Sequence, residues 1–277
     1  MSSSDDTKRA YDQIYSSDGI LLRDSMYLWL ISLLGARPGA SLLDISCGEG
    51  QLVKLAQERG LRATGMDFSE QGVRRGTGRT GRCNFAVGDG ERMPVANDSV
   101  DHVTHIGSLE HYHNPPQGAA EIARVLRPGG TAVVLLPNTF GVLHLGYVAR
   151  HGDVFDDGQP VQRYASRRAW ERMLEAGGLR VTRVTGTAGY VPPRTWRDAA
   201  WLARRPAKIA RVVLGLLTPA NLSNNIVYVC TKAAPGRSAC AAYGGASAAG
   251  YRRSGWRRQR SFSERWRGAI AKRCGTP

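Results

Sequence analysis

The feature that most constrains the fold is an alternation of two patterns between residues 40 and 137. Short apolar runs, each as long as a buried strand, are followed by stretches that carry apolar residues at helical spacing. The expected strands are residues 41–45, 61–66, 83–87, 99–106 and 130–136, and the expected helices are residues 51–59, a segment that begins at Glu70, and residues 117–126. Repeated strand–helix units form a parallel, doubly wound sheet with right-handed crossovers. The sequence therefore predicts an α/β domain in which ligands bind at the carboxyl ends of the strands.

An acidic residue follows or ends each of the first three predicted strands. These residues are Asp44, Asp67 and Asp89. Because the carboxyl ends of parallel strands meet at one edge of a sheet, the three carboxylates should line a single crevice. Asp67 has the spacing of a residue that accepts hydrogen bonds from ribose hydroxyls, and Asp89 can accept from an exocyclic amine such as that of adenine. Asp44 can orient the turn or face a cationic amine.

The turn after Asp44 contains Gly48 and Gly50, which let the backbone approach a ligand closely. A dinucleotide fingerprint would have a third glycine where this chain has Val53, and no further glycine or basic residue indicates a pyrophosphate. The pattern therefore favours a nucleoside without phosphates over NAD.

At this point the sequence resembles the class I S-adenosylmethionine-dependent methyltransferases, specifically the small-molecule branch that includes quinone and sterol methyltransferases. The motifs that carry the resemblance stand in family order at residues 42–50, 65–69, 87–94, 99–101, 108–111 and 121–130. The resemblance implies a Rossmann-like sheet of seven strands, mostly parallel with an antiparallel last strand. It also implies S-adenosylmethionine as the cofactor.

The resemblance further implies which residues bind the cofactor. By this analogy the methionine part is held by Asp44, Ser46, Cys47, Gly48 and Gly50, the ribose by Asp67 and Phe68, the adenine by Asp89 and Gly90, and the region of the methyl-bearing sulfur by Ile106, Gly107 and Ser108. The family usually has glycine where this chain has Ser46. A serine is expected to fit there only if its backbone keeps a negative φ.

Four of the six histidines lie between residues 102 and 113. His102 and His105 should point to opposite faces of a strand, which argues against a shared metal ion, and no metal site is predicted. His111 lies beyond the strand end and is the candidate general base or substrate contact. Asn114-Pro115-Pro116 is similar to a motif that holds planar amines in nucleic-acid amino-methyltransferases, but an ordinary helix start at proline is the stronger interpretation.

The chain is expected to have three parts. Residues 1–38 should form an N-terminal helical cap, and residues 39–233 should form the methyltransferase domain. In the second half of that domain, a helix is expected at residues 164–178, strands at 179–185 and 224–232, and a lid or insertion at 186–223. Within the insertion, residues 196–217 are basic and amphipathic. They could be a substrate lid, a peripheral contact with an anionic membrane, or a helix packed on the sheet with a solvated basic face.

The third part, residues 234–277, is a low-complexity tail rich in arginine. It carries nine of the fifteen net positive charges of the chain, and its few large apolar residues predict a mostly disordered segment. Trp256 and Trp266 could stack on bases or enter a lipid interface, so a nucleic-acid contact through the tail is an open alternative. A solvated extension with no specific role is the favoured interpretation.

A cytoplasmic location is expected. The five cysteines are scattered without a C-x-x-C pair, which favours a reducing compartment. The first ten residues lack the apolar core of a signal peptide, and no apolar run approaches the ~20 residues of a spanning helix.

The expected function is transfer of a methyl group from S-adenosylmethionine to an oxygen, nitrogen or carbon atom of a small-molecule acceptor, such as a lipid-linked or secondary metabolite. The alternatives are an RNA or protein methyltransferase that docks through the basic tail, and a non-catalytic binding protein on the same fold.

Overall fold

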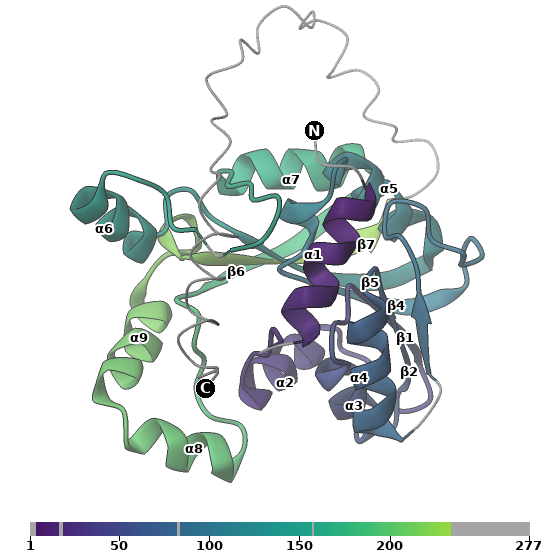
Figure 1. Cartoon of the computed structure of the whole chain (residues 1–277), viewed down its shortest axis with the longest axis horizontal. Coiled ribbons are helices and arrows are strands. Elements are labelled where there is room, and N and C mark those ends of the chain that lie inside the picture. Colours follow the sequence, from purple (N-terminus) through teal and green to yellow (C-terminus); the bar gives the residue numbers. More distant parts are fainter. Residues whose placement is uncertain (1–3, 17–18, 82–83, 157, 234–277) are drawn as a thin grey trace, which may run out of the picture. The chain divides into compact units, whose positions relative to one another are not determined.

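The computed structural model describes residues 4–16, 19–81, 84–156 and 158–233 (Figure 1). Seven strands in these residues form one sheet, in the order β3-β2-β1-β4-β5-β7-β6. The strands are β1 (Ser41–Ile45), β2 (Arg62–Asp67), β3 (Phe85–Val87), β4 (Val100–Ile106), β5 (Leu126–Pro137), β6 (Leu179–Thr187) and β7 (Asn225–Lys232). Strands β1 to β5 are parallel to one another, and β7 runs antiparallel to both β5 and β6. The predicted mostly parallel, seven-stranded α/β sheet with an antiparallel last strand is confirmed.

The helices of the described residues are α1 (Ser4–Ser16), α2 (Asp24–Leu33), α3 (Gln51–Gln57), α4 (Glu70–Thr80), α5 (Pro115–Val125), α6 (Val142–His151), α7 (Arg167–Ala176), α8 (Trp196–Ala203) and α9 (Pro206–Leu217), with short 3-10 turns η1 (Leu109–His111) and η2 (Ala220–Leu222). Local chemistry sets several of the starts. The Ser69 hydroxyl caps α4, as predicted, by accepting a hydrogen bond from the Gly72 amide. Asn114 caps α5, and Pro115 follows at the first helical position, so this motif is an ordinary helix start.

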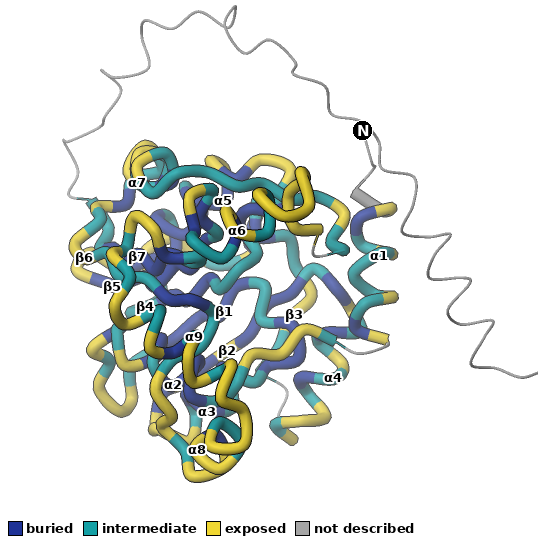
Figure 2. Tube along the Cα trace, turned by 90° about the vertical axis from the view of Figure 1, so that its left-hand side faces the viewer, coloured by how far each residue is buried: buried dark blue, intermediate teal, exposed yellow. Residues whose placement is uncertain are grey.

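Alternating side chains of the central strands bury both faces of the sheet. On β5, Val134 and Leu136 pack with residues of α5 and α7, whereas Val133 and Leu135 pack with residues of α2 and α3. This alternation follows from the two-residue period of a strand. The result is a sheet with helices on both faces, and Figure 2 shows the buried strands between the helices. With both faces covered, the edge where the strands end is left for a ligand site.

The predicted tail, residues 234–277, lies outside the described residues. Among the helices that the structure describes, no helix is long and apolar enough to span a membrane.

Candidate cofactor and acceptor site

The carboxylate of Asp67, at the end of β2, is the centre of the crevice. Its Oδ2 accepts a hydrogen bond from the Gly48 amide at 2.7 Å, and its Oδ1 accepts one from the Ser69 amide at 2.8 Å. Burial raises the pKa of Asp67 to about 6, although these amide bonds act in the opposite direction. Each carboxylate oxygen has a second lone pair, so both can accept further hydrogen bonds from a ligand. Asp67 thus joins the ends of β1 and β2 and keeps acceptor capacity.

Asp44 lies beneath the same turn, at the end of β1. The side chain is buried, and it accepts a hydrogen bond from the Thr104 hydroxyl of β4 at 2.6 Å. Burial and, to a smaller extent, the nearby Asp67 raise the pKa of Asp44 to about 7. Two buried carboxylates with raised pKa values therefore lie at adjacent strand ends, where a cationic ligand would favour their ionised forms.

The turn after β1 contains the clearest departure from expectation. Ser46 has a φ of +56°, so the expectation of a negative φ is wrong. The physical reason is the turn itself, which takes left-handed conformations at Ser46, Gly48 and Gly50. The Ser46 hydroxyl lies 3.0 Å from the Tyr112 hydroxyl, and this hydrogen bond offsets part of the backbone strain.

Close packing explains the glycine at position 48. A Cβ added at Gly48 would lie 2.8 Å from the hydroxyl oxygen of Tyr15, which belongs to α1. Cys47, between Ser46 and Gly48, is half-buried, and its amide donates to the Met66 carbonyl of β2. The turn is thus fixed between the end of β2 and the N-terminal helix.

Asp89 and Gly90 follow β3 on the far side of Asp67. Asp89 accepts a hydrogen bond from the Glu91 amide at 2.8 Å and remains partly exposed. Gly90 is buried against Tyr112, so a Cβ at this position would collide with the Tyr112 hydroxyl. Phe68, directly after Asp67, is half-buried. Tyr112 therefore spans from Ser46 to Gly90, which are the residues expected at the two ends of the cofactor.

Tyr112 was not singled out by the sequence patterns. It follows η1, in a segment without periodicity, and its hydroxyl also lies 2.9 Å from His105 Nε2. Burial lowers the pKa of His105 to about 3, so this imidazole is neutral at ordinary pH.

Helix α1, which was expected as part of a helical cap, contributes directly to the crevice. Asp12 accepts hydrogen bonds from the Ser69 hydroxyl at 2.5 Å and from the Gln71 amide at 3.3 Å, at the start of α4. Tyr11 donates a hydrogen bond to Gln159 at 3.1 Å. A sequence signal existed, because Tyr11 and Tyr15 are spaced four residues apart and share one helix face.

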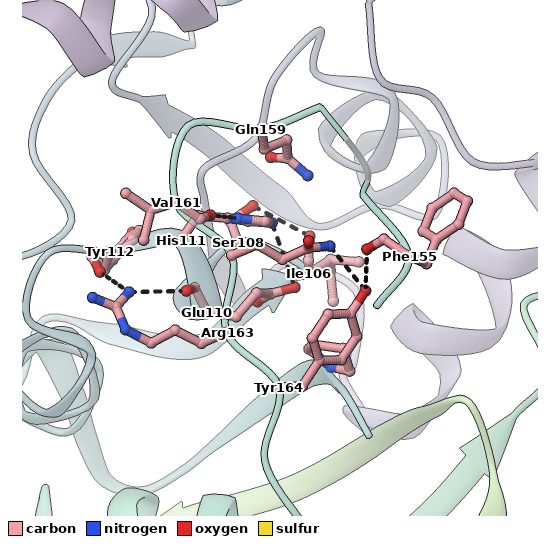
Figure 3. Close-up of polar contacts among 12 residues, drawn as sticks. Ile106, Ser108, Glu110, His111, Tyr112, Phe155, Gln159, Val161, Arg163 and Tyr164 are labelled. Atoms are coloured by element: carbon pink, nitrogen blue, oxygen red, sulfur yellow. Dashed lines mark hydrogen bonds and ion pairs between the residues drawn. The ribbon is translucent and has the colours of Figure 1, made fainter. Parts of the chain in front are cut away.

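The fourth strand end, that of β4, leads to the candidate catalytic residue. Ile106 ends β4, and the Gly107 amide donates to the Leu135 carbonyl of β5. The Ser108 hydroxyl donates to the Ile106 carbonyl at 3.4 Å. The chain then enters η1, which ends at His111 (Figure 3).

His111 is buried, and its environment selects one tautomer. Its Nδ1 contacts the Val161 carbonyl oxygen, which can only accept, so Nδ1 carries the proton. In the neutral ring Nε2 is then the basic nitrogen, and it lies 3.7 Å from Glu110 Oε1. Arg163 donates to the Glu110 carbonyl at 3.0 Å and to the Tyr112 carbonyl at 2.5 Å (Figure 3). These bonds fix the segment that contains Val161 against η1.

The elements of the site thus comprise a doubly wound sheet, a glycine turn on a buried ribose-type carboxylate, and an oriented imidazole at the same edge. This arrangement suits a domain that binds a nucleoside-containing ligand at the carboxyl ends of the strands. Residues 43–134 match the family model described as a methyltransferase domain. These residues are therefore similar to a methyltransferase domain, in agreement with the resemblance that the sequence motifs carry.

Similar sequences agree with this class. A demethylmenaquinone methyltransferase of Beutenbergia cavernae is 35% identical over 133 residues, which cover 47% of this chain and 54% of the relative. The 27-O-demethylrifamycin SV methyltransferase of Amycolatopsis mediterranei is 29% identical over 62% of this chain and 65% of its own length. The match spans about half the length of the first of these relatives.

Similar structures agree in fold. A methyltransferase from Thermotoga maritima superposes with a TM-score of 0.57 at 15% identity, covering 82% of this chain and 99% of its own. A (4+2)-cyclase superposes with a TM-score of 0.60 at 19% identity, covering 84% of this chain and 97% of its own.

Proposed function

We propose that the protein transfers a methyl group from S-adenosylmethionine to a small-molecule acceptor. The observation that carries this proposal is the junction of Asp67 with the Gly48 amide. It puts a buried carboxylate with remaining acceptor capacity beside a turn whose backbone a ligand can approach. A carboxylate that can accept hydrogen bonds fits a cofactor with ribose hydroxyls and a positive charge. When bound, S-adenosylmethionine supplies a methyl group on a cationic sulfur, which is activated for displacement.

The residues of this chain have three tasks in such a reaction. The proposed cofactor contacts are Asp44, Ser46, Cys47, Gly48, Gly50, Asp67, Phe68, Asp89, Gly90, Ile106, Gly107 and Ser108. We assign the role of general base to His111, because the Val161 carbonyl leaves Nε2 as the proton acceptor. Glu110, 3.7 Å from Nε2, would stabilise the proton that the ring takes up. Helix α1 covers the crevice with Tyr15, which limits access of water.

The acceptor is the untested part of this function. Relatives that methylate a menaquinone precursor and a rifamycin support an acceptor that is a lipid-linked or secondary metabolite. The test is to incubate metabolite extracts with the protein and cofactor labelled in the methyl group. We expect label in an organic-soluble small molecule. Label that appears only in RNA or protein would contradict the proposal.

We further propose residues 39–233 as the catalytic domain, residues 1–38 as its cap and the cytoplasm as its location. Residues 234–277 lie outside the described structure, so a nucleic-acid contact there has no structural support. Peripheral contact with a membrane through residues 196–217 does have structural support, in the exposed side chains of α8 and α9.

A further inference from the structure

Helix α9 presents an apolar stripe that nothing in the described structure covers. Exposed apolar residues recur at helical spacing along its 12 residues, which extend about 18 Å. They are Ile209 (40% exposed), Val213 (47%), Leu216 (68%) and Leu217 (77%). Val212, which lies beside the stripe on the helix surface, is buried against the domain. Exposed leucines in a row on one helix mark an interaction surface, because leaving them in water is unfavourable.

Helix α8 precedes α9 and also carries an exposed apolar side chain. It begins with Trp196, which is 76% exposed. Figure 1 shows α8 and α9 joined end to end, away from α5 and α7 on the other side of the sheet. Tryptophan is the side chain most typical of the boundary between lipid and water.

Basic residues are frequent in the segment that contains the stripe. Residues 194–217 contain six arginine or lysine residues and one acidic residue, Asp198. The single acid is already neutralised, because Asp198 is buried and lies 2.7 Å from the Arg23 guanidinium. The remaining positive charge of residues 194–217 therefore has no acidic counterpart within this segment.

Two aromatic rings hold part of this charge in place. Tyr190 and Trp201 stack with their centroids 5.9 Å apart. Arg205 lies 4.6 Å from the Trp201 ring, and Lys208 lies 5.0 Å from the Tyr190 ring. Arg211 also lies 5.1 Å from the Tyr190 ring, and its Nε is buried without a hydrogen-bond partner in the described structure. These cation–π contacts position the cations for an anionic ligand.

We propose that the segment formed by α8 and α9 docks the protein on an anionic lipid bilayer. In this arrangement the cations near Tyr190 and Trp201 face lipid phosphates, and the stripe from Ile209 to Leu217 enters the boundary of the acyl chains. The inference rests on the proposed function in one respect: docking brings the site to an acceptor that resides in the membrane.

Charge decides between a bilayer and the other occupants. A second copy of this chain would bring the same six cations against each other, and like charges in an interface are unfavourable. A nucleic acid would match the charge but not the row of exposed leucines. It also could not stack on Trp201, because Arg23 and Arg205 already occupy that ring. Of these three occupants, the anionic bilayer matches both the charge and the stripe.

Vesicle flotation with the full chain tests the proposal. We expect binding to vesicles of phosphatidylcholine mixed with phosphatidylglycerol and little binding to phosphatidylcholine alone. The double change Leu216→Ser with Leu217→Ser should weaken binding by about tenfold or more, because both side chains leave the acyl boundary. Arg204→Ala with Arg205→Ala should weaken it by about fivefold for each charge removed.

Matched changes on other elements provide the controls. Leu145→Ser removes a leucine that is 43% exposed on α6, and Arg172→Ala removes an exposed arginine on α7. Both should bind vesicles like the parent chain, and residues 234–277 are the same in every variant. Thermal unfolding of each variant shows whether the domain is intact.

Three results would overturn the inference. One is equal vesicle binding by the parent and both double variants. Another is a dimer that dissociates on Leu216→Ser with Leu217→Ser while vesicle binding persists. The third is loss of RNA binding, but not of vesicle binding, in Arg204→Ala with Arg205→Ala. The proposed methyl transfer is tested separately by cofactor binding, which needs no vesicles, so failure of one leaves the other standing.

Discussion

At the scale of single residues, the site depends on carboxylates that burial makes weakly acidic. Asp44 has a pKa of about 7 and Asp67 one of about 6, against an ordinary value of 3.8. In the unfolded chain both groups ionise at the ordinary value. The stabilising contribution of each protonated form is therefore present at low pH and is lost as pH rises through the folded-state pKa. At neutral pH Asp67 is mostly ionised and Asp44 is about half ionised. This buried negative charge is unfavourable for the fold and favourable for a cationic ligand.

We expect Asp44→Asn to change how stability depends on pH. The amide keeps the hydrogen bond from Thr104 but cannot ionise, so the variant should gain on the parent between about pH 5 and about pH 8. The gain is at most about 1.4 kcal/mol per pH unit. Urea unfolding at the two pH values measures it. A stability difference that is the same at both would mean that Asp44 is ionised throughout.

Ser46 should be a site where glycine is better than serine. Its φ of +56° is unfavourable for any residue with a Cβ. We expect Ser46→Gly to raise the free energy of unfolding by about 1 kcal/mol, because the strain relieved, about 2 kcal/mol, exceeds the roughly 1 kcal/mol lost with the bond to Tyr112. Ser46→Ala keeps the Cβ and removes the bond to Tyr112, so it should lower the same quantity by about 1 kcal/mol. If chemical denaturation finds the glycine variant less stable than the alanine variant, the backbone there is not strained.

His111 should control the pH dependence of the reaction once an acceptor is known. We expect His111→Ala to lower kcat by about a hundredfold or more and to remove the limb of the pH–rate profile that reports uptake of a proton by this ring. His113→Ala is the matched control, because His113 is two residues away and its Nε2 lies 3.3 Å from the Thr7 hydroxyl. An unchanged profile in His111→Ala would exclude it as the base.

At the scale of elements, α1 depends on Asp12 for its place over the crevice. We expect Asp12→Ala to increase hydrogen exchange of the α1 amides and to weaken binding of S-adenosylhomocysteine by about tenfold, since two hydrogen bonds to the start of α4 are lost. Asp6→Ala, which removes a surface pair with Arg9, should do neither. Equal exchange in the two variants would contradict a role for Asp12 in holding the helix.

The sequence predicted the elements whose signals are local. The apolar run of β1, the Ser69 cap and the proline start of α5 all depend on neighbours in the chain, and each lies where it was expected. Ser46 was misjudged because its φ is set by the turn as a whole and not by the serine. The place of Tyr112 across the crevice depends on contacts with Ser46 and Gly90, which lie 66 and 22 residues away in the sequence. Such contacts leave no periodic signal.

At the scale of the whole molecule, the fold alone does not determine the chemistry. A (4+2)-cyclase and a methyltransferase superpose on this chain about equally well, so the fold is compatible with more than one reaction. The side chains at the strand ends bear on the cofactor, because a buried carboxylate beside a glycine turn is suited to accept hydrogen bonds from ribose hydroxyls. The large net charge of the chain has little bearing on that site, since most of it belongs to residues 234–277.

Calorimetric titration with S-adenosylhomocysteine is the most direct test of the cofactor site. We expect the full chain to bind one equivalent, and Asp67→Ala to bind at least about tenfold more weakly while it still unfolds cooperatively. Asp101→Ala, which changes a carboxylate near the amino end of β4, should bind like the parent. Absence of binding by the parent chain, or equal affinity in Asp67→Ala, would contradict the assignment of this crevice to S-adenosylmethionine.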